Sequence, residues 1–164
     1  MSFNNIKTRT QAERGFTIVE LLIVIVVIGI LAAITIVSFN GVTSKANTSN
    51  AASNAEAIQK VAESFNADNS YYPSTNADFT AGTNTVKLPS GVTVATGTIG
   101  TVPTLDSTTG KTKIVYRYKG TAGAATGGKI QYFDFGTKAL SGNVIYVGDG
   151  KSTDTDASFN TPTA

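Results

Sequence analysis

The sequence contains no cysteine and no histidine, and both absences narrow the kinds of site that it can form. Disulfide bonds, Cys/His metal sites and most pairs of a nucleophile with a general base are excluded. An enzyme built from the remaining residues would depend on paired carboxylates or on a Ser–Lys pair, and no spacing in the sequence marks either. We therefore predict a protein without enzymatic activity. The absence of cysteine leaves the redox compartment open, because a chain with a large enough core folds outside the cell without disulfides.

Charge is also scarce: charged residues make up 15% of the 164 residues, while Gly, Thr, Ser, Ala and Asn are abundant. Such a mixture is typical of strands joined by turns. The formal net charge of +2 comes from residues 1–15, where Lys7, Arg9 and Arg14 stand against Glu13, and the rest of the chain is neutral. A neutral body argues against broad electrostatic binding to nucleic acid, so no specific nucleic-acid partner is predicted.

One long apolar run begins directly after this basic stretch. Residues 21–34 read LLIVIVVIGILAAI, and the apolar character extends from Phe16 to Val37. As a helix, this segment is long enough to cross the roughly 30 Å hydrocarbon core of a bilayer. A helix is required because lipid offers the backbone no hydrogen-bond partners. The basic flank predicts that the N-terminus lies in the cytoplasm.

Two simpler interpretations of the run are a secretory signal peptide and a plain signal anchor. A secretory signal peptide has a small-residue cleavage site after its apolar core, whereas this core continues through LAAITIVSFNG without a clear stop. A signal anchor accounts for everything except Glu20, which lies inside the run. A charge at the centre of such a segment costs about 2.5–3.5 kcal/mol on insertion scales, and less near an end.

Glu20 is the most informative residue of the chain, because an ionisable residue inside a membrane segment is by default functional and has a partner. No cationic side chain lies within the predicted helix near it. A new α-amino group at Phe16, from the same chain or from a neighbouring subunit, would supply the positive charge. Two alternatives follow from the residues alone: Glu20 extends its carboxylate to the membrane interface, or it favours the helix N-terminus electrostatically.

The stretch RGFTIVELLIVIVVIGILAAI resembles the class III signal of type IV pilins and pseudopilins. The resemblance implies that a prepilin peptidase cleaves on the cytoplasmic side, between Gly15 and Phe16, and methylates the new amine of Phe16. It also implies that Glu20 pairs with the N-terminal amine of an adjacent subunit during assembly.

One position departs from the family pattern. Many family members carry a proline late in the apolar segment, where this chain has Val37, and no proline precedes Pro73. Gly29 and the β-branched residues 35–37 are weaker helix formers. We therefore expect any stretching or local melting of the assembled helix between Gly29 and Phe39.

The helix is predicted to continue beyond the apolar run. Apolar residues recur at spacings of three and four, as on one face of a helix. They are Ala51, Ala55, Ile58, Val61, Ala62 and Phe65. The alternative is a separate helix after a loop at Asn40-Gly41.

The remainder predicts β structure. Strands are expected at 113–118, 129–135 and 143–147, with weaker candidates at 86–88 and 92–94. Gly-rich segments at 120–128 and 136–142 predict turns, as do Pro89 and Gly91. The expected fold class is α+β and pilin-like: a long N-terminal helix, transmembrane and then amphipathic, packed on a C-terminal antiparallel sheet.

The predicted organisation has three parts. Residues 1–15 form a cleaved leader peptide. Residues 16–66 form the long helix, with a transmembrane and assembly segment at 16–37. Residues 67–164 form a β-rich head.

Three acidic residues near the C-terminus are weak candidates for a metal site. Asp149, Asp154 and Asp156 could bind calcium through oxygen atoms, but their spacing is not that of a helix–loop–helix calcium site, and a solvated loop is favoured. No other cofactor is predicted. The Ser- and Thr-rich tail, 152–164, is expected to be modified or simply hydrated and mobile.

The resemblance implies the major pilin of a type IV pilus, which polymerises through its N-terminal helix into a surface filament for adhesion and twitching motility. Its partners would be further copies of itself, the prepilin peptidase, minor pilins, and an assembly platform with its ATPase. It would lie in the cytoplasmic membrane before assembly and on the cell surface afterwards. The alternatives are a pseudopilin of a type II secretion or DNA-uptake system, and a membrane-anchored domain that never polymerises.

Overall fold

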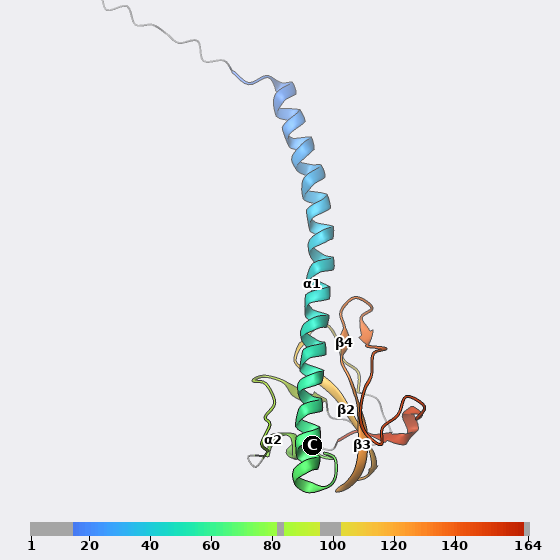
Figure 1. Ribbon diagram of the computed structural model, residues 1–164. Helices are drawn as coiled ribbons and strands as arrows, with labels where there is room; N and C mark the ends of the chain where they lie inside the picture. Colours follow the sequence, from blue (N-terminus) through green and yellow to red (C-terminus); the bar gives the residue numbers. More distant parts are fainter. Residues whose placement is uncertain (1–14, 82–83, 96–102, 163–164) are drawn as a thin grey trace, which may run out of the picture. The chain divides into compact units, whose positions relative to one another are not determined.

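A computed structural model describes residues 15–81, 84–95 and 103–162 of the chain (Figure 1). The chain forms two compact units, Met1–Phe39 and Asn40–Ala164. Helix α1, Ile18–Asn69, contributes residues to both units. The remaining elements belong to the second unit. They are helix α2 (Asn76–Thr80), the 3₁₀ turns η1 (Thr109–Lys111) and η2 (Asp156–Ser158), and the strands β1 (Thr93–Ala95), β2 (Lys113–Thr121), β3 (Ala124–Gln131), β4 (Phe133–Asp134), β5 (Ala139–Leu140), β6 (Ile145–Gly148) and β7 (Phe159–Asn160).

In the first unit, helix α1 exposes apolar side chains on all sides. Its large apolar side chains in this unit are between 48% and 84% exposed, and no residue from 15 to 39 is buried. A helix that is apolar all round requires lipid or other helices as cover. By length and composition, α1 is the one helix among the described residues that could cross a bilayer, as predicted.

The prediction that the helix continues into the second unit is confirmed. Asn40 and Gly41 lie inside α1, which ends at Asn69. Ser70 then adopts a left-handed backbone with φ of 64°. The residues predicted to share one helix face are all buried, and most of them join the sheet in one core. They are Ala51, Ala55, Ile58, Val61, Ala62 and Phe65.

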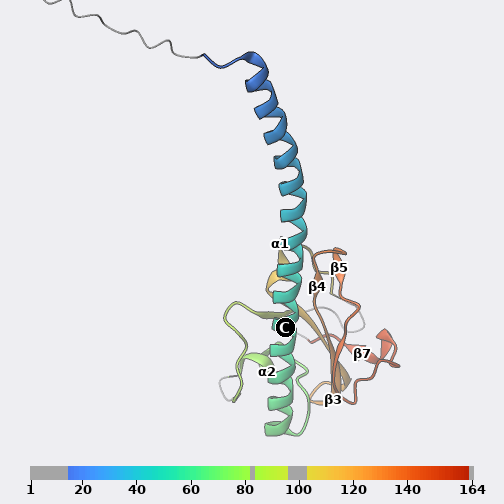
Figure 2. The same ribbon diagram turned by 45° about the horizontal axis from the view of Figure 1, so that its top comes forward.

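The sheet of the second unit is largely antiparallel, as predicted, but one of its strand pairs is parallel. Its order is β1-β2-β3-β6, β7 also pairs with β2, and β4 and β5 form a separate ribbon (Figure 2). All pairs are antiparallel except β1 with β2, which are parallel. A parallel pair needs a long crossover, and the chain between β1 and β2 is long enough to provide one. The predicted strand at 86–88 is wrong, because these residues form no strand.

Most residues of the Gly-rich segment 120–128 belong to strands of the sheet, and only a short part of the segment forms a turn. We predicted a turn over the whole segment, but the turn is confined to the residues between β2 and β3, where Gly123 has φ of 77°. The rest belongs to β3. A Cβ on Gly127 would lie 2.5 Å from Val147 O. Glycine is therefore required at this position because the neighbouring backbone lies too close for a side chain. A run of glycines in a sequence is equally compatible with such a close approach and with a turn.

The C-terminal tail is part of the core, so the prediction of a hydrated, mobile tail is wrong around Phe159. The side chains of Phe159 and Thr161 are fully buried, as is Arg117 on β2. Arg117 Nη2 donates a hydrogen bond to Phe159 O at 2.7 Å. Lys129 Nζ lies 5.1 Å from the centre of the Phe159 ring, within the range of a cation–π contact. Together with β7, these contacts fix the tail on β2.

We expect Phe159→Ala to lower the free energy of unfolding by about 3–5 kcal/mol, because a fully buried aromatic ring is removed. Chemical unfolding of the full-length chain in a membrane mimetic, followed by the near-UV circular dichroism of its tyrosines, measures this loss. Thr153→Ala is the matched control, since Thr153 lies in the same tail and is exposed. Equal stability of the two variants would show that the tail is not part of the core.

Candidate assembly site at the start of helix α1

The peptide bond between Gly15 and Phe16 lies outside regular secondary structure. Residues 15–17 are neither helix nor strand, and α1 begins at Ile18. Phe16 is 89% exposed, and a Cβ on Gly15 would have no described atom within 4 Å beyond its chain neighbours. A peptidase therefore has access to this bond. The predicted leader, except for Gly15, lies outside the described residues.

Thr17 and Glu20 form a capping box at the start of α1. Thr17 N donates to Glu20 Oε2 at 2.9 Å, and Thr17 Oγ1 donates to the same oxygen at 2.8 Å. Glu20 N donates to Thr17 Oγ1 at 3.2 Å. These bonds satisfy backbone N–H groups that the first turn of a helix leaves without intrahelical partners. This role of Thr17 was not predicted, although Thr followed three residues later by Glu is the capping-box signature.

The capping box uses one oxygen of the Glu20 carboxylate. Both bonds from Thr17 end on Oε2, and no hydrogen bond to Oε1 comes from the part of the chain that the structure describes. A carboxylate oxygen accepts more than one hydrogen bond. The carboxylate can therefore keep its cap and still accept a further donor, such as an ammonium group.

Apolar side chains surround this carboxylate. Phe16, Leu21, Ile23 and Val24 join Glu20 in lining a shallow pocket of about 460 Å³. Lipid or apolar protein can cover such a surface, but a carboxylate inside it needs a charged or hydrogen-bonding partner. The surface therefore fits a partner that is apolar apart from one positive charge.

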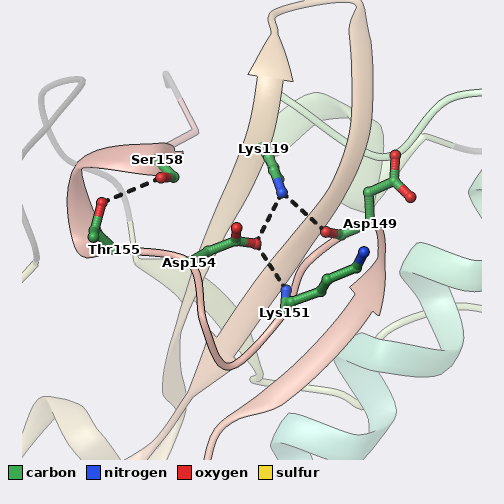
Figure 3. A network of polar contacts seen from close by, with 6 residues as sticks. All are labelled: Lys119, Asp149, Lys151, Asp154, Thr155 and Ser158. Atoms are coloured by element: carbon green, nitrogen blue, oxygen red, sulfur yellow. Dashed lines mark hydrogen bonds and ion pairs between the residues drawn. The ribbon is translucent and has the colours of Figure 1, made fainter.

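The acidic residues near the C-terminus are arranged around a lysine. Lys119 Nζ forms an ion pair with Asp154 Oδ2 at 2.9 Å and donates to Asp149 O at 3.1 Å, and Lys151 N donates to Asp154 Oδ2 at 2.9 Å (Figure 3). The carboxylate of Asp149 points away from this network in Figure 3. The side chain of Asp156 lies outside the described part of the structure. In the described ranges, no three acidic, Cys or His side chains are grouped to hold a metal ion, and calcium binding stays a prediction.

Comparisons with known proteins bear on the N-terminal site. A family profile described as "Prokaryotic N-terminal methylation motif" matches residues 10–36, which include Gly15, Phe16 and Glu20. The chain is 37% identical over 67 residues to type II secretion system core protein G of Escherichia coli (strain K12), a match that covers 41% of this chain and 46% of that protein. It is 43% identical over 54 residues to a fimbrial protein of Pseudomonas aeruginosa, covering 33% and 35%. These matches show the N-terminal region of the type IV pilin and pseudopilin family in this chain.

The family and the pilin-like α+β fold class predicted from the sequence are thus confirmed. The chain spans about half, or less, of the length of the curated relatives that it matches. These relatives include both secretion-system and fimbrial proteins of the family. No solved structure gives a significant match to this pilin-like chain.

We expect Asp154→Asn to destabilise the second unit at neutral pH and to have little effect in acid. Hydrogen bonds from Lys119 and from the backbone of Lys151 hold the pKa of Asp154 below its ordinary value of 3.8. Because the folded-state pKa is the lower one, the ionised carboxylate stabilises the fold above about pH 4. That stabilisation is lost as the pH falls through the folded-state pKa.

Unfolding of wild type and variant between pH 7 and pH 2 measures this difference. Asp149→Asn is the matched control, since its carboxylate points away from the network (Figure 3). A difference between Asp154→Asn and wild type that stays constant over the whole pH range would contradict the assignment.

Proposed function

We propose that the chain is the major pilin of a type IV pilus, made as a membrane-inserted precursor and polymerised after cleavage between Gly15 and Phe16. The observation that carries the proposed polymerisation is the Glu20 carboxylate. One of its oxygens is tied to Thr17, the other accepts no bond from the described residues, and the surrounding helix surface is apolar.

The exposed apolar surface of residues 16–39 supports polymerisation. Lipid covers this surface in the precursor. After extraction, the same surface would be covered by the apolar helices of other copies, because a helix that is apolar on all sides is not stable in water. The exchange replaces lipid contacts with protein contacts and so supplies little driving force of its own. We therefore propose an assembly platform with its ATPase, as in the family, as partners that drive extraction.

Cleavage would create the positive charge that Glu20 needs. A prepilin peptidase that cuts after Gly15 leaves an ammonium group on Phe16, which the same enzyme is proposed to methylate. In its own chain, this cation lies at the positive end of the helix dipole, which is unfavourable. Pairing with Glu20 Oε1 of an adjacent copy compensates both charges in apolar surroundings. Such a pair would also set the stagger between neighbouring helices.

Localisation follows from the same steps. The precursor is proposed to span the cytoplasmic membrane once, with its basic leader inside. The assembled subunit is proposed to lie in a surface filament that also contains minor pilins and serves adhesion and twitching motility.

A pseudopilin of a type II secretion or DNA-uptake system is the second candidate, because several relatives are secretion proteins. The N-terminal site suits both functions equally. Deletion of the gene separates them: loss of abundant long surface fibres favours the pilin, whereas loss of secretion or of DNA uptake without a change in surface fibres favours the pseudopilin.

We expect Glu20→Ala to leave membrane insertion intact and to lower the yield of sheared filament about tenfold or more, because a charge pair in apolar surroundings is removed. Subunit in the sheared and membrane fractions is quantified by immunoblot. Glu56→Ala is the control, since Glu56 is an exposed carboxylate on the same helix. Normal filaments from Glu20→Ala would exclude the proposed role of this carboxylate.

A further inference from the structure

A groove of about 530 Å³ lies on the second unit, between residues 40–48 of α1 and the β4–β5 ribbon. Five of its lining residues come from α1 and four from the ribbon and its turn. We call this set the lysine groove: Asn40, Gly41, Ser44, Lys45 and Thr48, with Asp134, Phe135, Gly136 and Lys138.

Thr48 on α1 ties the two walls of the lysine groove together. Phe135 N donates to Thr48 Oγ1 at 3.0 Å, and Thr48 Oγ1 donates to Ser44 O at 3.0 Å. On the ribbon side, Gly136 N donates to Asp134 Oδ1 at 2.7 Å. The walls cannot separate without the loss of the bond between Phe135 N and Thr48 Oγ1, and the other two bonds hold each wall in place.

The groove has an excess of positive charge. Lys45 and Lys138 are both exposed, and neither forms an ion pair with a carboxylate in the described ranges. Asp134 is the acidic residue among the described lining residues, and it directs Oδ1 to the backbone of the ribbon. The amide of Asn40 and the hydroxyl of Ser44 add neutral hydrogen-bonding groups. Two ammonium groups beside neutral donors suit a phosphate group.

The position of Lys45 along the helix matches the far surface of a bilayer. Residues 21–44 carry no charged side chain, and a helix of this length rises about 36 Å. The hydrocarbon core of a bilayer is about 30 Å thick, and about 40–45 Å with its headgroup regions. With Glu20 at one interface, Lys45 therefore reaches the headgroup level of the other.

We propose that the lysine groove binds the phosphate of an anionic phospholipid in the outer leaflet while the subunit is stored in the membrane. Lys45 and Lys138 supply the cationic contacts, and Asn40 and Ser44 supply hydrogen bonds. The proposal rests on the proposed function, because it requires a membrane-inserted subunit. The bound lipid fixes the depth of the subunit in the bilayer before extraction.

A carboxylate of a second copy is the competing occupant. The depth of Lys45 favours lipid, since a headgroup phosphate lies at this level in every membrane that the chain spans. The charge balance points the same way, because the chain after residue 15 is neutral overall and has no acidic excess to direct at the groove.

Native mass spectrometry of the full-length chain in mild detergent tests the proposal, with phosphatidylglycerol and phosphatidylcholine as probes at equal concentration. We expect preferential retention of phosphatidylglycerol, reduced about fivefold by Lys45→Gln and about fivefold by Lys138→Gln, because a lysine near an anionic lipid surface contributes about that factor. The double variant Lys60→Gln/Lys87→Gln is the control, since both lysines are exposed and lie outside the groove. It should retain the lipid like the wild type.

Three outcomes would overturn the proposal. The first is equal retention of the two lipids. The second is full displacement of phosphatidylglycerol by inorganic phosphate at the same concentration. The third is a dimer that both groove variants abolish.

Resistance of the chain to alkaline extraction from membranes is measured in parallel. A chain that is extracted contradicts the proposed function itself, whereas a resistant chain without lipid preference contradicts the groove proposal alone.

Discussion

The apolar surface of helix α1 between residues 16 and 39 is the constraint on which the rest of the protein depends. No side chain in this stretch is buried by the chain itself, so cover must come from lipid or from other copies. Lipid and apolar helices are nearly equivalent as cover. In the proposed function, the subunit is therefore stored in one environment and transferred to the other, and a polar contact is needed to make the assembled arrangement specific. Glu20, capped by Thr17 through one oxygen, lies where such a contact is needed.

The second unit places its sheet on the same helix. Ala51, Ala55, Ile58, Val61 and Ala62 on α1 are buried in one apolar cluster with side chains of the sheet. Inside the sheet, Gly127 lies close against the backbone of the neighbouring strand. On the outer side of β2, the tail around Phe159 completes the core. The second part of α1, the sheet and the tail therefore form one compact unit.

Features with a local cause were predictable from the sequence, and features with a distant cause were not. The buried face of α1 follows from a spacing of three and four residues, and Gly15, Phe16 and Glu20 follow from a short motif. Thr17 was predictable by the same local logic and was missed. The parallel β1, the burial of Arg117 under the tail and the pairing of Lys119 with Asp154 depend on segments far apart in the chain. The glycines of β3 were predicted to form a turn, because turns and close contacts between strands both favour glycine.

We propose that the protein polymerises through a cleaved N-terminus. Intact-mass and N-terminal peptide analysis of material sheared from the cell surface tests it most directly. We expect one dominant species that begins at N-methylated Phe16. An uncut chain that stays in the membrane fraction would contradict the account and would favour an anchored domain that never polymerises.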